Sequence, residues 1–119
     1  MTDTPAAQFL TLATTDHWAE LQALMAELTG AAPYWRMQST SGVLFPPSDG
    51  WHADWDHQFR LVTYKYIEWC ELFPRPGDAG LTLADVHQAC EAIGFEVEAE
   101  ADRIRLLGYR RLSPISPEP

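Results

Sequence analysis

The chain has 119 residues, of which 46% are hydrophobic and 12% aromatic, and its net charge is −9 at pH 7. This length corresponds to one domain, and the composition supplies a hydrophobic core and excludes an intrinsically disordered chain. The acidic balance argues against nucleic acids and anionic membranes as partners, because both require clustered Lys and Arg side chains. It favours a basic protein partner instead.

The two ends of the chain differ in composition from its middle. Residues 1–14 are small and polar, and residues 112–119 contain three prolines. We therefore predict a flexible lead and a flexible tail around a single domain at residues 15–111. The sequence shows neither a basic leader with an apolar stretch nor a long apolar run. We expect a cytoplasmic protein in which Cys70 and Cys90 are reduced, buried thiols.

The first predicted element is an amphipathic helix that begins near Thr15 and ends before Gly30. Its apolar residues recur three and four positions apart, at Trp18, Leu21, Leu24, Met25 and Leu28. Two short strands follow, at residues 34–38 and 43–45. A Pro-Pro pair ends the second strand, because proline cannot continue a hydrogen-bonded ladder.

Residues 57–73 fit two different structures. Their apolar side chains recur three and four positions apart, as in a helix, at Phe59, Val62, Tyr66, Trp69 and Phe73. The same stretch is rich in β-branched and aromatic residues, which is typical of two strands that turn near Tyr64. No capping signal opens the helix, so we predict the two strands. Glu68 and Glu71 lie on either side of Trp69 and would point to opposite faces of a strand but to one face of a helix. As paired carboxylates they could act in acid–base catalysis, but we expect an outward-facing charge beside Trp69 instead.

The C-terminal third predicts a second helix and a β-hairpin. Thr82 is a suitable N-cap with Asp85 at the capping-box position, and Gly94 ends the helix. Apolar and charged residues then alternate over residues 95–99 and 103–106, which indicates a hairpin with an apolar inner face. The element order is therefore α-β-β-β-β-α-β-β. We expect an α+β fold in which two helices pack on one face of a mostly antiparallel sheet.

Two groups of residues are candidates for binding a partner. The loop after the Pro-Pro pair combines acidic side chains with two tryptophans that we expect to be exposed, namely Asp49, Trp51, Asp54, Trp55 and Asp56. Tryptophan is enriched at the centres of protein interfaces, so this loop predicts an aromatic anchor with an acidic rim. The acidic residues Glu68, Glu96 and Glu98 would steer a basic partner toward it. Alternatively, Arg103 and Arg105 on the next strand neutralise the last two.

The same loop admits a second interpretation, a small metal-dependent enzyme whose ligands are Asp49, His52, Asp54, Asp56 and His57. Their spacing matches neither the calcium loop nor the two-histidine zinc helix, and the sequence contains no nucleophile elbow, phosphate loop or dinucleotide fingerprint. We therefore predict no enzymatic activity, no cofactor and no bound metal. A homodimer formed through an exposed strand edge is a third interpretation.

Residues 15–111 resemble small bacterial immunity proteins of polymorphic toxin systems, which are built as helix, meander, helix and hairpin. The resemblance lies in the helix with Trp18 and in four further segments, Tyr34-Trp35-Arg36, Gly50-Trp51 through Trp55-Asp56, Tyr66-Ile67-Glu68-Trp69, and Arg105-Leu106-Leu107-Gly108-Tyr109-Arg110. It implies a stoichiometric binder that neutralises a cognate toxin by docking an acidic, aromatic surface over a basic active site. It implies nothing about which toxin is bound.

Overall fold

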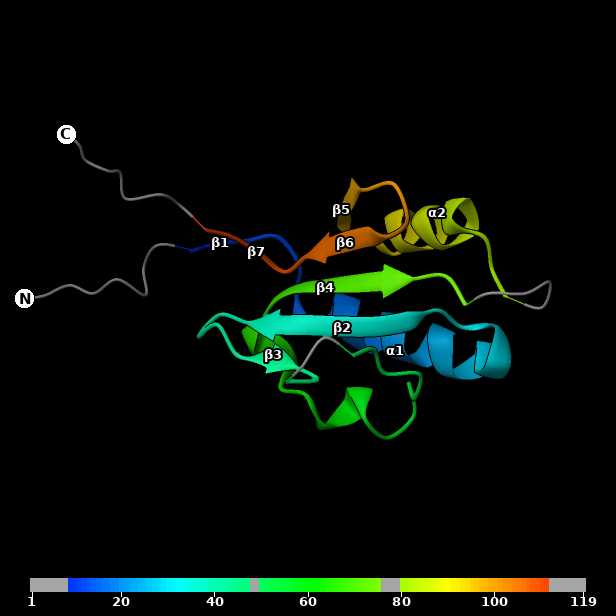
Figure 1. Ribbon diagram of the computed structural model, residues 1–119. Coiled ribbons are helices and arrows are strands. Elements are labelled where there is room, and N and C mark those ends of the chain that lie inside the picture. The colour runs from blue at the N-terminus through cyan, green and yellow to red at the C-terminus, as the bar shows by residue number, and fades with distance from the viewer. Residues whose placement is uncertain (1–8, 48–49, 76–79, 112–119) are drawn as a thin grey trace, which may run out of the picture.

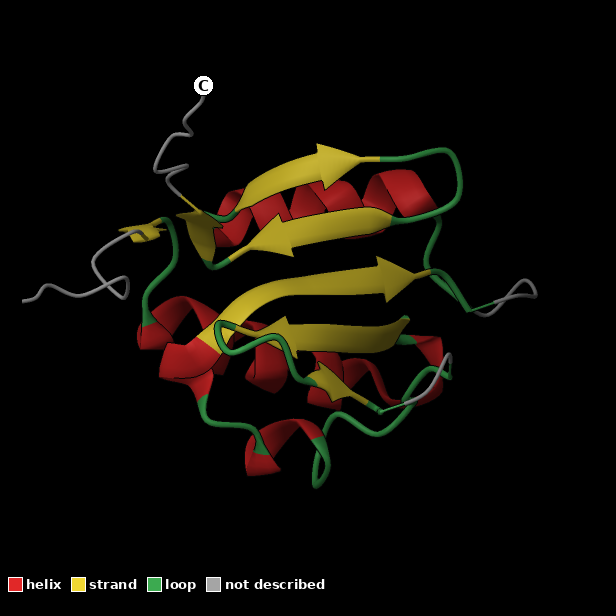
Figure 2. Cartoon of the chain, turned by 60° about the vertical axis from the view of Figure 1, so that its left-hand side comes forward, coloured by secondary structure: helices red, strands yellow, loops and turns green. Residues whose placement is uncertain are grey.

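The fold is built on a five-stranded antiparallel sheet with strand order β3-β2-β4-β6-β5 (Figure 1). The computed structural model describes residues 9–47, 50–75 and 80–111. The strands of the sheet are β2 (Tyr34–Ser39), β3 (Leu44–Phe45), β4 (Ile67–Phe73), β5 (Glu96–Ala99) and β6 (Ile104–Leu107). The helices α1 (Thr15–Leu28) and α2 (Leu83–Ile93) both lie on one face of this sheet, as Figure 2 shows. The predicted α+β fold class is confirmed.

Both predicted helices form for the reasons that the sequence suggests. The apolar stripe of α1 turns inward, and its residues Trp18, Leu21 and Met25 are buried. At the start of α2, the Thr82 hydroxyl accepts a hydrogen bond from the Asp85 backbone N–H at 3.1 Å, and the Asp85 carboxylate accepts one from the Thr82 N–H at 3.3 Å. Aspartate is therefore long enough to complete the capping box here. Among the described residues, no helix is long and apolar enough to cross a membrane.

The core lies between the helices and the sheet. Alternate residues of the three central strands face the helices, and each pairs with a similar residue on the neighbouring strand, namely Trp35, Met37, Cys70, Leu72, Ile104 and Leu106. Cys70 and Cys90 are buried and unpaired, as predicted. Burial raises the pKa of both thiols, that of Cys90 to about 12, so these residues pack as small hydrophobic groups.

The prediction of two strands within residues 57–73 is wrong in its first half. Two 3-10 turns, η3 (Phe59–Leu61) and η4 (Tyr64–Tyr66), occupy that half, and the single strand β4 follows them. The reason is the burial of Phe59, whose ring lies 5.0 Å from that of Trp35. Packing this ring under the sheet edge requires a compact turn, and this tertiary contact overrides the β-propensity of the stretch.

A second, two-stranded sheet joins the two ends of the described chain. Its strands β1 (Phe9–Thr11) and β7 (Tyr109–Arg111) pair antiparallel and lie beyond one end of the large sheet (Figure 1). Ala13, which follows β1, is buried in the core. The folded domain therefore begins earlier than the sequence predicts. The rest of the predicted lead, residues 1–8, and the predicted tail, residues 112–119, lie outside the described residues.

Gly108 connects the two sheets. Its N–H donates to the backbone oxygen of Glu68 at 2.8 Å, and its own oxygen accepts from the N–H groups of Leu12 and Ala13. A Cβ atom at this position would lie 2.1 Å from the backbone oxygen of Ile67, closer than any side chain tolerates. Only glycine therefore allows the chain to pass so close to β4 as it leaves β6.

Candidate functional site

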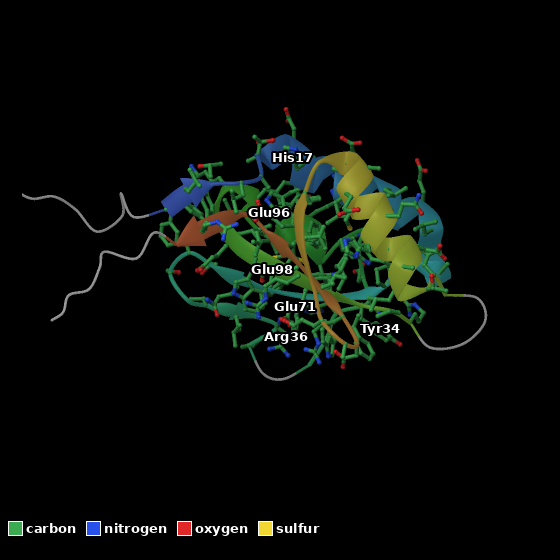
Figure 3. The ribbon with its side chains drawn as sticks, turned by 90° about the horizontal axis from the view of Figure 1, so that it is seen from above. His17, Tyr34, Arg36, Glu71, Glu96 and Glu98 are labelled. Atoms are coloured by element: carbon green, nitrogen blue, oxygen red, sulfur yellow. The ribbon has the colours of Figure 1, made fainter. Side chains whose placement is uncertain are left out.

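The second face of the five-stranded sheet is covered by neither α1 nor α2, and we call it the helix-free face. A row of charged residues crosses it from strand to strand, because Arg36 is in register with Glu71, Glu71 with Arg105, and Arg105 with Glu98. Figure 3 shows Arg36 and Glu71 on the opposite side of the sheet from His17 of α1. The alternation that points apolar residues toward the helices therefore places this row on the helix-free face.

The carboxylate of Glu71 is the centre of this row, and the residue is only 4% exposed. Its Oε2 atom accepts hydrogen bonds from Arg105 Nη2 at 2.7 Å and Nε at 3.2 Å. Its Oε1 atom lies 3.5 Å from Arg103 Nη1 and 3.6 Å from Arg36 Nε. A carboxylate can be buried at this position because three guanidinium groups surround it.

Aromatic rings stack against the same guanidinium groups. The Arg36 and Arg103 guanidinium carbons lie 5.4 and 5.2 Å from the centroid of the Trp51 ring. The corresponding carbon of Arg105 lies 4.2 Å from the Trp69 ring. The Trp51 ring is held in turn by Phe73, with centroids 5.4 Å apart. Cation–π contacts and the bonds to Glu71 thus fix both the rings and the arginines.

The cluster on this face holds more positive groups than negative ones. Three guanidinium groups meet two carboxylates there, because Asp102 also bonds Arg103, with Oδ1 at 3.0 Å from its Nε. That bond holds the pKa of Asp102 below its ordinary value and raises the pKa of Arg103. Each guanidinium remains partly exposed, so its outward N–H groups are oriented before any partner arrives. Such preorganisation reduces the entropy lost on binding.

Three of the residues predicted for partner binding lie on or beside the helix-free face. Trp51 is partly buried there, stacked as described above. Glu98 is exposed on β5, in register with Arg105, although the guanidinium of Arg105 bonds Glu71 instead. Glu96 is also exposed on β5 and pairs with Arg110. The predicted neutralisation of these glutamates by Arg103 and Arg105 is wrong, because both arginines bond Glu71 on the far side of β6.

Asp54, Trp55 and Asp56 lie elsewhere, beside the end of α1. The expected exposure of Trp55 is wrong, since this side chain is 3% exposed and its Nε1 donates to the Pro33 oxygen at 2.8 Å. Asp54 has a structural role, because its Oδ1 accepts from the backbone N–H groups of Asp56 and His57, which lowers its pKa. Asp56 is exposed, with an oxygen 3.7 Å from Arg60 Nη1.

Two further predicted site residues remain. An outward-facing charge is expected beside Trp69, but Glu68 is only 9% exposed. Glu71 does point to the helix-free face, where the surrounding arginines leave it 4% exposed. The backbone oxygen of Glu68 accepts from the Gly108 N–H at the point where the chain passes the start of β4 on its way to β7. Asp49 lies outside the described residues.

The structure does not bring the proposed metal ligands together. The His52 ring packs against both Trp35 and Phe45, with centroids 4.7 and 4.9 Å away. His57 is exposed at the other end of the loop. Over residues 9–47, 50–75 and 80–111, no three His, Cys, Asp or Glu side chains are placed to hold a metal ion.

Sequence reasoning missed the importance of Arg36 and Glu71. The alternation within each strand indicated correctly which residues leave the core. It did not indicate that β6 lies between β4 and β5, and this strand order is what gives Arg105 a choice of two glutamates. A useful signal was the excess of arginine, since seven of the eight basic residues are arginine, the residue that stacks on rings and bonds carboxylates in pairs.

The sequence matches the family of unknown function DUF6678 over residues 4–113, which is most of the chain. Comparison with curated proteins and with solved structures finds no match.

Proposed function

The chain belongs to the DUF6678 family, whose function is unknown, and we propose that it is a stoichiometric protein-binding module. Its proposed partner is a basic protein, namely a cognate bacterial toxin domain that is neutralised when the sheet docks over its active site. The observation that supports this proposal most is the helix-free face, where Trp51, Trp69 and three arginines are fixed around Glu71.

The residue types on this face are those that supply binding energy in protein interfaces. Trp, Tyr and Arg dominate the few positions at which truncation weakens a complex strongly. Trp51 is held at the surface by Phe73 and two guanidinium groups, so it can be covered by a partner without rearrangement. A ring and a planar cation that are already ordered lose little side-chain entropy when a complex forms.

The charge of the chain supports a basic partner. The net charge is −9, Glu96 and Glu98 are exposed on β5, and Asp56 is exposed on the loop beside α1. Long-range attraction between such a surface and a basic one raises the association rate, and added salt reduces the effect. Glu98 borders the helix-free face and would steer the approach. The Trp51 ring would supply the contact, while Glu71 and Asp102 offset the charge of the arginines that hold it.

The first test is co-expression with the product of the adjacent gene, followed by size-exclusion chromatography with light scattering. We expect a one-to-one complex. Glu98→Lys should slow its association several-fold at low salt and weaken the salt dependence of the rate. The matched control is Glu20→Lys, the same charge change at an exposed position of α1, which should have a much smaller effect. Equal effects of the two changes would exclude Glu98 from the approach path.

The same experiment tests the prediction that the acidic loop containing Asp54 and Asp56 takes part in partner binding. Asp56→Lys is the informative change there, because Asp54 caps backbone N–H groups and its replacement would alter the loop itself. If the acidic loop takes part in steering, Asp56→Lys slows association as Glu98→Lys does. If only the helix-free face is used, Asp56→Lys behaves like the Glu20→Lys control.

A further inference from the structure

An apolar groove at the β3 edge of the sheet has no part in the proposed function. Three of the four large hydrophobic side chains that are exposed in the described part of the chain line this groove, with exposed fractions of 63% for Val43, 72% for Leu61 and 52% for Tyr66. The fourth, Leu10, lies apart in β1. Hydrophobic side chains gathered in one concave place on a surface usually mark a binding site.

The groove lies on the helix-covered side of the sheet, at its β3 edge. Its floor consists of Met37 and Ile67, which are buried, and its walls come from the β2–β3 hairpin and from the turns η3 and η4. These segments lie together along the edge of the sheet in Figure 1. Met37 faces the helix-covered side, so the groove and the helix-free face lie on opposite sides of the sheet. The two surfaces can therefore be tested separately.

The size and chemistry of the groove fit a small molecule. Its volume is about 380 Å³, within the range of small-ligand pockets. All of its lining residues are uncharged, and the hydroxyl groups of Ser39 and Thr63 are among its few polar groups. The only lysine of the chain is next to a lining residue, with the Nζ of Lys65 5.2 Å from the ring centroid of Tyr66.

We propose that this groove binds a small amphipathic anion, specifically a medium-chain carboxylate. The hydrocarbon chain would lie on Met37 and Ile67 between the exposed side chains of the walls. The carboxylate would remain at the rim beside the Lys65 ammonium group. This arrangement buries the apolar part of the ligand and leaves both charges accessible to water, so no desolvated ion has to be formed.

The edge itself argues against a peptide as the occupant. A peptide that added to β3 would need a row of free backbone groups, but β3 has only two residues, Leu44 and Phe45. Pro46 and Pro47 follow directly and lack the N–H groups that a further ladder requires. The short edge and its prolines thus block strand addition, whereas the groove beside them remains open.

Isothermal titration calorimetry with octanoate, decanoate and dodecanoate, each kept below its micelle concentration, tests the proposal on the full chain. We expect saturable one-to-one binding that strengthens about fourfold for each added methylene group, because each buries similar apolar surface. Lys65→Gln should weaken decanoate binding about two- to fivefold and leave decanol binding unchanged, as for an exposed ion pair. Loss of decanol and decanoate binding to the same extent would contradict the role of Lys65.

A matched pair of surface variants locates the ligand. Leu61→Ser removes an exposed wall residue and should weaken decanoate binding about tenfold, whereas Leu10→Ser, the identical change at an exposed position of β1, should have no effect. The absence of saturable binding, or equal weakening by both variants, overturns the proposal. So does a concentration-dependent dimer in sedimentation that Leu61→Ser abolishes, since a second copy would then be the occupant. None of these variants touches the helix-free face, so failure here leaves the proposed partner binding intact.

Discussion

The two faces of the five-stranded sheet use the same strands for different physical purposes. On the helix-covered face, Trp35, Leu72 and Ile104 are buried against the helices and against one another. On the helix-free face, one position along from each, stand the partly exposed arginines and rings that surround Glu71. The difference shows how a strand of seven residues such as β4 can contribute to a hydrophobic core and to a recognition surface at once.

The largest expected effect is a difference in lost stability between substitutions on the two faces. Trp35→Ala removes a fully buried ring that contacts Phe59, and we expect it to lower the free energy of unfolding by about 3–5 kcal/mol. Trp69→Ala removes a ring of the same size from the helix-free face, where it is partly exposed, and should cost about 1–2 kcal/mol. Urea denaturation followed by circular dichroism measures both. Equal losses would mean that the helix-free face is a second core.

A smaller effect tests whether Glu71 organises the helix-free face. Glu71→Gln keeps the size of the side chain but leaves three guanidinium groups without their shared carboxylate. Because these groups retain access to water, we expect a loss of about 1–3 kcal/mol rather than the full cost of a buried unpaired charge. Glu98→Gln, the same change in the same row at an exposed position, should alter stability by less than about 0.5 kcal/mol. Similar values for the two variants would remove Glu71 from the centre of the cluster.

The smallest effect concerns pH. Burial lowers the pKa of His52 below its ordinary value of 6.5, and the nearby Asp54 only partly opposes this shift. His52 Nε2 also has no hydrogen-bond partner within the described part of the chain, so protonation gains no bond there. The unfolded chain then binds the proton more readily than the folded chain, so protonation of His52 favours unfolding. The contribution of neutral His52 to the free energy of unfolding is complete above pH 6.5 and is lost as the pH falls toward the pKa of His52 in the folded chain.

Two variants distinguish this histidine from its neighbour. His52→Phe keeps the stacking on Trp35 and Phe45, and it should flatten the decline in unfolding free energy below pH 6.5. His57→Phe changes an exposed ring of the same loop and should leave the wild-type pH dependence in place. An unchanged pH dependence in His52→Phe would assign the decline to other groups.

The elements predicted correctly are those whose signals are local. The stripe that contains Trp18 and Leu21, the Thr82 capping box and the alternation around Glu96 each depend on residues within a few positions of one another. The errors arise from distant contacts. Trp55 reads as an exposed loop residue because its neighbours are acidic, yet its bond partner Pro33 lies 22 residues away. Likewise, β1 is too short to show a period, and it forms only because β7 returns beside it.

The candidate site was predictable only in part for the same reason. Trp51 and Glu98 were recognised from their types, and both lie at the helix-free face. Their connection through Arg36, Glu71 and Arg105 depends on strand order, which alternation within a single strand does not encode. The single acidic surface expected from the sequence is therefore two separate regions, one on β5 and one on the loop beside α1.

The most direct test of the central claim is the affinity of Trp51→Ala for the co-purified partner, measured by calorimetry beside Leu10→Ala as the control. If the helix-free face is the binding surface, removing the ring that Phe73, Arg36 and Arg103 hold in place should weaken binding at least about tenfold. Leu10→Ala should bind like the wild type. Wild-type affinity in a folded Trp51→Ala variant would contradict the claim.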